Sequence, residues 1–138
     1  MVDPDTIRKR LALLQDALSD LRRYRTKYDA KTLMSDRDVQ HMVLHALYVA
    51  AQSAIDLALH AAADAEQSTS TTYQQAFERL ANAGRLNPAL AQRLMGWAGL
   101  RNVLAHHYAN IDYARIATTL AHELPDLEQF AAVAAGWL

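Results

Sequence analysis

The chain has 138 residues, the size of one ordinary domain, and can bury a core without covalent cross-links. It contains no cysteine, which excludes disulfides, thiolate metal sites and cysteine nucleophiles and is compatible with a reducing cytoplasm. The net charge of −1, from 14 Lys/Arg against 15 Asp/Glu, argues against a protein that holds nucleic acid mainly by bulk positive charge. We therefore expect a single domain over residues 1–138.

The N-terminal sequence MVDPDTIRKRLALL lacks a basic start followed by an uninterrupted apolar run, so no secretory signal is expected. No stretch approaches the roughly 20 apolar residues that a membrane span needs. These two patterns predict a soluble, cytoplasmic protein with no membrane contact.

Apolar residues recur at helical spacing along almost the whole chain, and glycine and proline are rare. The first helix is expected to begin at Asp3 and Pro4, an N-cap followed by proline at the first helical position. Its apolar stripe has the 4-3-4-3 spacing of a bundle helix and comprises Ile7, Leu11, Leu14, Leu18 and Leu21. The second helix is expected to open at Ser35, with Asp38 in a box-like cap, and to run about 30 residues to about Ala65.

A polar segment at residues 67–72, QSTSTT, is expected to be a loop. Thr72 and Gln75 form a capping box for a third helix, which is expected to stop at Gly84. The apolar residues of this helix are Tyr73, Phe77 and Leu80.

A fourth helix is expected to start at Asn87 and Pro88. Asp112 caps a fifth, which Pro125 should kink or divide because proline cannot continue a helix undisturbed. The core residues expected from the fourth helix are Leu90, Leu94, Trp97 and Leu104. The fold class is therefore expected to be all-α, a five-helix up-and-down bundle.

The densest basic stretch is interleaved with two tyrosines and comprises Arg22, Arg23, Tyr24, Arg25, Lys27, Tyr28 and Lys31. One interpretation is a solvated helix end, where cations complement the helix dipole. The other is a surface that contacts phosphates or docks an acidic partner. The sequence leaves both open.

Polar residues also follow one face of the second helix. His41 and His45 have a spacing at which two imidazoles can share a metal ion, but HMVLH lacks the glutamate of a metalloprotease and no third ligand is suitably placed. We therefore expect no metal site. The same face continues through Tyr48, Gln52 and Asp56, all within roughly 80°. This polar stripe is either the exposed face of the helix or the lining of a cleft or subunit interface.

The sequence RNVLAHHY, at the end of the fourth helix, gathers a guanidinium, a carboxamide, two imidazoles and a phenol. A histidine can move a proton near neutral pH, and Arg101 can hold a phosphate through paired hydrogen bonds. Those are the parts of a metal-independent ribonuclease, in which an imidazole takes the 2′-hydroxyl proton and a cation stabilises the phosphorus oxygens. The alternative is structural, with histidines that favour the helix dipole and an Arg101 that pairs with a carboxylate.

This segment resembles the Arg-x4-His-x-Tyr signature of HepT-like proteins, a branch of the HEPN superfamily of helical ribonucleases. The match places Arg101, His106 and Tyr108 in the signature, and Asn102 follows the arginine as it commonly does there. A looser HEPN pattern would also accept His107, but only His106 leaves the tyrosine correctly placed. Residues 52–60, 73–80 and 99–100 also match the family in order, so that the resemblance covers essentially the full chain.

The resemblance implies a homodimer whose two Arg–His motifs face each other across a cleft and cleave RNA, tRNA or mRNA, without metal. It implies the toxin of a toxin–antitoxin pair and a cognate nucleotidyltransferase antitoxin of the MNT type as partner. That antitoxin would transfer AMP from ATP onto Tyr108, so ATP would not be a cofactor of this chain and none is expected. The alternative is a non-catalytic nucleotide-binding or scaffold subunit of a nucleotidyltransferase complex.

The expected catalytic residues are Arg101 for the phosphate and His106 as acid/base, with Asn102 hydrogen-bonded to His106 to orient it. Candidates for the cleft lining are His107, Gln52 and Asp56. On an ideal helix Arg101 lies about 20° from Tyr108 but about 140° from His106. The helix must therefore loosen around residues 105–107, or one site must combine residues of two subunits.

Overall fold

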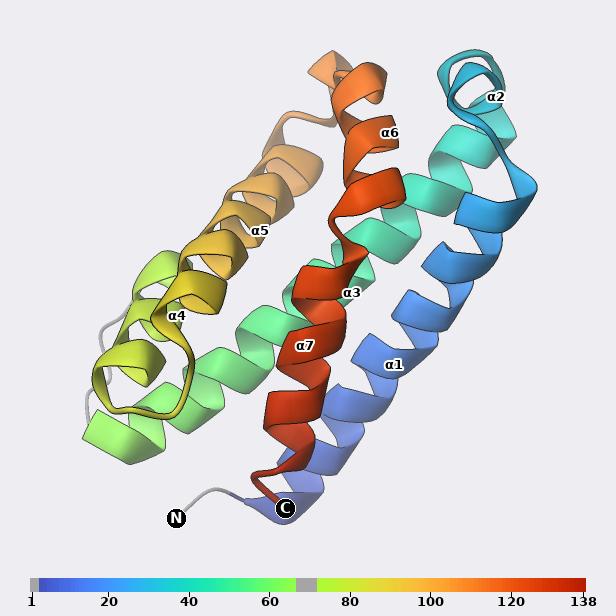
Figure 1. Cartoon of the computed structure of the whole chain (residues 1–138). Helices are drawn as coiled ribbons and strands as arrows, with labels where there is room; N and C mark the ends of the chain where they lie inside the picture. The colour runs from blue at the N-terminus through green and yellow to red at the C-terminus, as the bar shows by residue number, and fades with distance from the viewer. Residues whose placement is uncertain (1–2, 67–71) are drawn as a thin grey trace.

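The computed structural model describes residues 3–66 and 72–138. These residues form seven α-helices and one short 3-10 helix and contain no strand, so the all-α prediction is confirmed but the number of helices is not five. In chain order (Figure 1) the elements are α1 (Pro4–Lys27), α2 (Ala30–Ser35), α3 (Arg37–Glu66), α4 (Tyr73–Asn82), α5 (Pro88–His106), η1 (Tyr108–Asn110), α6 (Tyr113–His122) and α7 (Leu124–Ala135).

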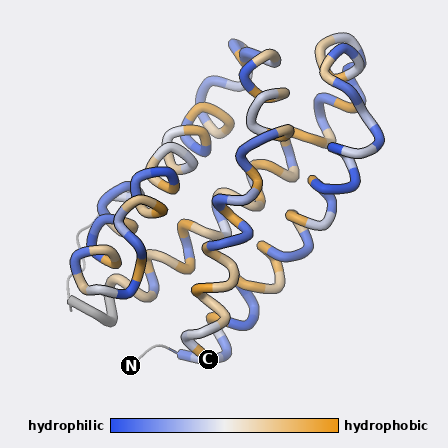
Figure 2. Tube along the Cα trace, viewed as in Figure 1, coloured by the Kyte–Doolittle hydropathy of each residue, from blue (hydrophilic) through white to orange (hydrophobic). Residues whose placement is uncertain are grey.

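The longest helix, α3, runs through the middle of the bundle and contacts α1, α2, α4, α5 and α7. In Figure 1, α1 lies along one side of α3, and α4 and α5 lie on the other. Apolar and polar residues alternate along the helices in Figure 2, as expected of helices that each bury one face. All five residues of the apolar stripe predicted for α1 are buried, and they belong to one continuous core cluster.

The predicted start of the second helix, at Ser35, was wrong. Asp29 caps an additional short helix, α2, so that Ser35 is still helical and its hydroxyl donates to the Lys31 carbonyl at 2.9 Å. The cap of α3 falls one residue later, where Asp36 Oδ1 accepts from the amides of Asp38 and Val39 at 2.9 and 3.2 Å. The predicted end of this helix, near residue 65, agrees with its end at residue 66.

The other predicted helix ends are confirmed. Asp3 caps α1, Thr72 and Gln75 form both bonds of a capping box on α4, and Asn87 caps α5. Gly84 follows α4 with a φ of +76°, a left-handed conformation that glycine adopts without a steric penalty. The predicted loop at residues 67–72 lies outside the described residues except for Thr72.

Of the two expected outcomes at Pro125, a kink or a division, the structure shows a division of the fifth predicted helix. α6 starts after its cap Asp112 and ends at His122, and α7 begins at Leu124 with Pro125 in its first turn. Leu104, which was expected in the core, is only half-buried, and so is Tyr73 of the predicted apolar residues of α4; both pack against the edge of the core.

The expectation about apolar stretches also needs correction. Residues 37–62 of α3 are long and apolar enough, by length and composition alone, to cross a membrane. However, 56% of the most apolar window is buried inside the bundle, which is the situation of a core helix. Many of its buried positions are alanines, and these face the neighbouring helices.

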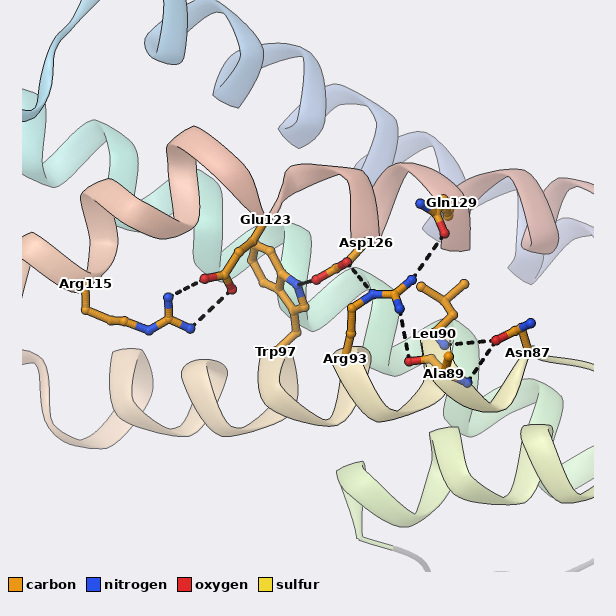
Figure 3. A network of polar contacts seen from close by, with 9 residues as sticks. All are labelled: Asn87, Ala89, Leu90, Arg93, Trp97, Arg115, Glu123, Asp126 and Gln129. Atoms are coloured by element: carbon orange, nitrogen blue, oxygen red, sulfur yellow. Dashed lines mark hydrogen bonds and ion pairs between the residues drawn. The ribbon is translucent and has the colours of Figure 1, made fainter.

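Polar contacts fix α7 against α5 and against α6 (Figure 3). Asp126 accepts from Arg93 Nε at 2.8 Å and from Trp97 Nε1 at 3.3 Å, so that one carboxylate of α7 binds two successive turns of α5. Arg115 binds Glu123 with both terminal nitrogens, and this hydrogen bond raises the pKa of the guanidinium. The half of α5 that precedes the RNVLAHHY segment is therefore held in place by α7.

Candidate active site

The RNVLAHHY segment occupies the last turns of α5 and the start of η1. The helix stays regular to its end, because the amide of His107 still donates to the carbonyl of Val103 at 2.8 Å. His107 itself has φ −130° and ψ 30°, and the chain leaves the helix there. The loosening comes too late to turn His106 towards Arg101, so the two side chains leave α5 about 140° apart. Tyr108 lies beyond the helix, and the 20° calculated for a continuous helix does not describe it.

The Arg101 guanidinium is held between α3 and α4. Its Nε donates to Gln52 Oε1 at 2.6 Å, and its Cζ lies 5.8 Å from the ring centre of Tyr48 and 5.0 Å from that of Tyr73. A guanidinium within about 6 Å of an aromatic ring is attracted by the negative face of the ring. Three side chains from two other helices therefore fix the position of this cation.

A polar chain continues from Arg101 across the bundle to α1. Gln52 Nε2 donates to Asp56 Oδ1 at 2.9 Å, and Asp56 Oδ2 forms an ion pair with Arg10 at 3.5 Å. The carboxylate of Asp56 thus binds Arg10 and the side-chain amide of Gln52. In the described part of the chain no carboxylate pairs with Arg101. The structural alternative, in which Arg101 is neutralised by an acid, does not hold within one chain.

The polar stripe of the second predicted helix faces α5 rather than solvent alone. His45 and Tyr48 line an open groove of about 380 Å³, together with Leu44 of α3 and with Leu104, Ala105 and Tyr108 from the end of α5 and η1. Gln52 and Asp56 are half-buried and reach Arg101 through the polar chain instead of lining this groove. His41 is exposed at the other end of the stripe.

The remaining residues of the motif face outwards. His106, His107 and Asn102 are exposed. The oxygen of the Asn102 side chain accepts from Arg101 Nη1 at 3.2 Å, and the hydrogen bond between Asn102 and His106 stays a prediction. Tyr108 is 73% exposed, and its ring stands at the edge of the groove.

Comparison with known proteins decides the family. A family model described as "Ribonuclease HepT-like" matches residues 14–134. The chain belongs to the HepT-like ribonuclease family. A protein of Aphanizomenon flos-aquae named tRNA nuclease HepT is 28% identical over 123 residues, which cover 89% of this chain and 83% of that protein. A Shewanella oneidensis protein named mRNA nuclease HepT is 26% identical over 102 residues, covering 74% of this chain and 77% of the other.

Solved structures share the fold of this HepT-like chain. A toxin–antitoxin complex with AMP-PNP has a TM-score of 0.85 at 22% identity, covering 96% of this chain and 98% of that one. The tri-AMPylated HEPN toxin of Shewanella oneidensis, in complex with an MNT antitoxin, has a TM-score of 0.85 at 23% identity over 97% and 99%. YutE of Bacillus subtilis, described as a cytosolic protein of unknown function, has 0.83 at 14% identity over 99% and 91%.

Two contacts of the HepT-like site were not predicted. Tyr73 was assigned to the apolar face of its helix, and nothing in the local spacing indicated that its ring would pack on Arg101. Arg10 belongs to the polar face of α1, which offers several equivalent basic residues, so its pairing with Asp56 had no signal in the sequence.

Two other clusters singled out in the sequence are the His41 and His45 pair and the basic stretch at residues 22–31. In the ranges 3–66 and 72–138, no three His, Asp or Glu side chains are grouped so that they could hold a metal ion with His41 and His45. Within the basic stretch, Arg22 pairs with Glu128 at 3.9 Å and Arg23 with Asp20 at 3.1 Å. These pairs favour the interpretation of that stretch as a solvated helix end.

Proposed function

We propose that this HepT-like chain is the toxin of a toxin–antitoxin pair and cleaves RNA, tRNA or mRNA, as a metal-independent endoribonuclease in the cytoplasm. The observation that carries the proposal is the state of Arg101. Its guanidinium is fixed by Gln52 and by two tyrosine rings without an acidic partner, so its positive charge remains available to a phosphate. The curated relatives named as tRNA and mRNA nucleases support the assignment of RNA as the substrate.

In this mechanism His106 removes the proton from the 2′-hydroxyl of the RNA, and the resulting oxygen attacks the adjacent phosphorus. The bond from phosphorus to the 5′ oxygen of the next nucleotide breaks, and that oxygen takes up a proton. Arg101 stabilises the negative charge that grows on the other phosphorus oxygens. Because α5 directs the two side chains away from each other, Arg101 of one subunit acts with His106 of the partner subunit across a homodimer cleft.

Mixing inactive variants tests this arrangement. Arg101→Ala and His106→Ala should each abolish RNA cleavage, measured with EDTA present, while remaining folded. After unfolding and refolding together in equal amounts, half of the dimers are mixed, and each mixed dimer has one intact site. About a quarter of the wild-type rate should then return. If the mixture stays inactive although mixed dimers form, the site lies within one subunit.

We further propose that the cognate MNT-type nucleotidyltransferase antitoxin silences the chain by AMPylation of Tyr108. The phenol oxygen attacks the α-phosphorus of ATP, pyrophosphate leaves, and the phenolic proton is released. The 73% exposure of Tyr108 makes its hydroxyl accessible to another protein, and the AMPylated HEPN toxin among the structural relatives supports the reaction. The added anion would block the groove by charge and by volume.

Mass spectrometry of the chain co-expressed with the antitoxin tests this second proposal. The peptide that contains Tyr108 should gain the mass of one or more AMP units, and Tyr108→Phe should gain none and remain toxic. A wild-type protein that never cleaves total RNA would instead favour the non-catalytic binding subunit.

A further inference from the structure

The groove beside Arg101 has a composition of its own. Leu44, Leu104 and Ala105 are half-buried and form apolar lining, whereas His45, Tyr48 and Tyr108 supply three rings. None of the described residues that line the groove is a carboxylate, and the groove volume of about 380 Å³ lies within the range of small-ligand sites. Its chemistry therefore suits a flat, largely uncharged ring system better than a cation or a second anion.

Tyr48 connects this groove to the cation. The Tyr48 ring borders the groove, and its centre also lies 5.8 Å from Arg101 Cζ. A ligand that places a phosphate on Arg101 therefore has the ring of Tyr48 beside the next part of its structure. In a nucleotide, that next part is the ribose with its base.

We propose that the groove is a nucleobase subsite, which binds the base of the RNA nucleotide whose phosphate contacts Arg101. This inference rests on the proposed function for the identity of the anion at Arg101. The base lies on the apolar lining formed by Leu104 and Ala105 and stacks on the tyrosine rings. Stacking is tolerant of base identity because every base has a π-face, so the subsite adds affinity more than sequence preference.

The exposure of Tyr108 fits the same role. A tyrosine that is 73% exposed leaves most of its ring without packing in the free chain, and a base in the groove would cover part of it. AMP attached to the phenol oxygen would begin at the rim of this groove. The modification would then compete directly with the base of the substrate.

Nucleotide fragments separate the contributions of base and phosphate. Unmodified protein is titrated with 5′-AMP, ribose 5-phosphate and inorganic phosphate, and binding is followed by calorimetry or by amide chemical shifts. Stacking of one base is worth about 1–3 kcal/mol, so 5′-AMP should bind roughly 5-fold to 150-fold more tightly than ribose 5-phosphate. Arg101→Ala should weaken the binding of both sugar phosphates.

A variant that fills the groove, compared with the same substitution outside it, tests where the base binds. Ala105→Trp enlarges a side chain that lines the groove, and it should abolish the advantage of 5′-AMP over ribose 5-phosphate. Ala89→Trp makes the same change at an exposed position in the first turn of the same helix and should keep the advantage. If circular dichroism shows that Ala105→Trp does not fold, the same comparison of 5′-AMP with ribose 5-phosphate is made with the smaller change Ala105→Leu.

Equal affinities of the wild-type protein for the two sugar phosphates would overturn the subsite, as would an undiminished preference for 5′-AMP in the folded groove-filling variant. The proposed catalysis fails separately. If the protein cleaves RNA but shows no preference for 5′-AMP, the subsite alone is refuted. A protein that prefers 5′-AMP in this groove but leaves RNA intact refutes the nuclease and keeps the subsite.

Discussion

Replacing Gln52 with methionine removes the only hydrogen bond described between Arg101 and α3 and nearly preserves the volume of the side chain. The Nε–Oε1 distance is 2.6 Å, and a hydrogen bond to a charged group contributes about 1.5–3 kcal/mol. Arg101 is half-buried and keeps its contacts to Tyr48 and Tyr73, each worth about 0.5–1 kcal/mol, so we expect the lower end of the range. A loss of about 1.5 kcal/mol of transition-state stabilisation lowers the rate roughly tenfold, and this is the effect that we expect of Gln52→Met.

The assay is single-turnover cleavage of RNA at saturating protein, which isolates the chemical step from binding. Gln92→Met is the matched control, because Gln92 is an exposed glutamine of α5 that makes no described contact with Arg101 and lines a different hollow, between α4 and α5. The control should cleave at the wild-type rate, and both variants should unfold at similar temperatures. A Gln52→Met protein that cleaves as fast as wild type would refute the view that Gln52 positions Arg101.

Three further predictions concern the stability of the fold. Phe77→Ala should lower the free energy of unfolding by about 3–5 kcal/mol in urea titrations, because the Phe77 ring is fully buried and packs edge-on against Phe130 at 5.6 Å; a loss below 1 kcal/mol would contradict this packing. Asn87→Ala should cost about 1 kcal/mol in the same titrations, since its side chain caps two amides at 2.8 and 3.2 Å, and no loss would mean that Pro88 alone fixes the start of α5. Hydrogen bonds from Thr32 lower the pKa of Asp29 below its ordinary 3.8, so the stabilisation from the charged form is complete above pH 3.8 and is lost as the pH falls through the lowered pKa. Acid unfolding of Asp29→Asn should lack this contribution, and an acid limb identical to that of the wild type would argue against it.

Local features of the fold were predictable from the sequence because their causes lie within a few residues. The capping residues Asp3, Thr72 and Asn87 bind amides two or three positions away, and the apolar stripe of α1 follows from helical spacing alone. The short helix α2 was missed because its six residues bury only Leu33, which leaves no apolar period to detect. Pro125 was correctly expected to disturb its helix, but proline chemistry alone does not distinguish a kink from a break.

The candidate site was predictable only in part. Helical phase placed Tyr48, Gln52 and Asp56 on one face of α3, and the family resemblance supplied Arg101. The contact between Gln52 and Arg101 joins residues 49 positions apart, so it depends on how α3 and α5 pack and not on either helix alone. The bond from Arg101 to the oxygen of Asn102 was not predicted, because the expected partner of Asn102 was His106.

The regular end of α5 has a consequence for dosage. Because the helix points Arg101 and His106 in different directions, the composite site that we propose is complete only when two chains meet. Below the dissociation constant of the pair, halving the amount of protein lowers the number of complete sites about fourfold by mass action. For the toxin that we propose, activity in this range rises with the square of expression, so that dilution limits the effect of a few copies before any antitoxin acts.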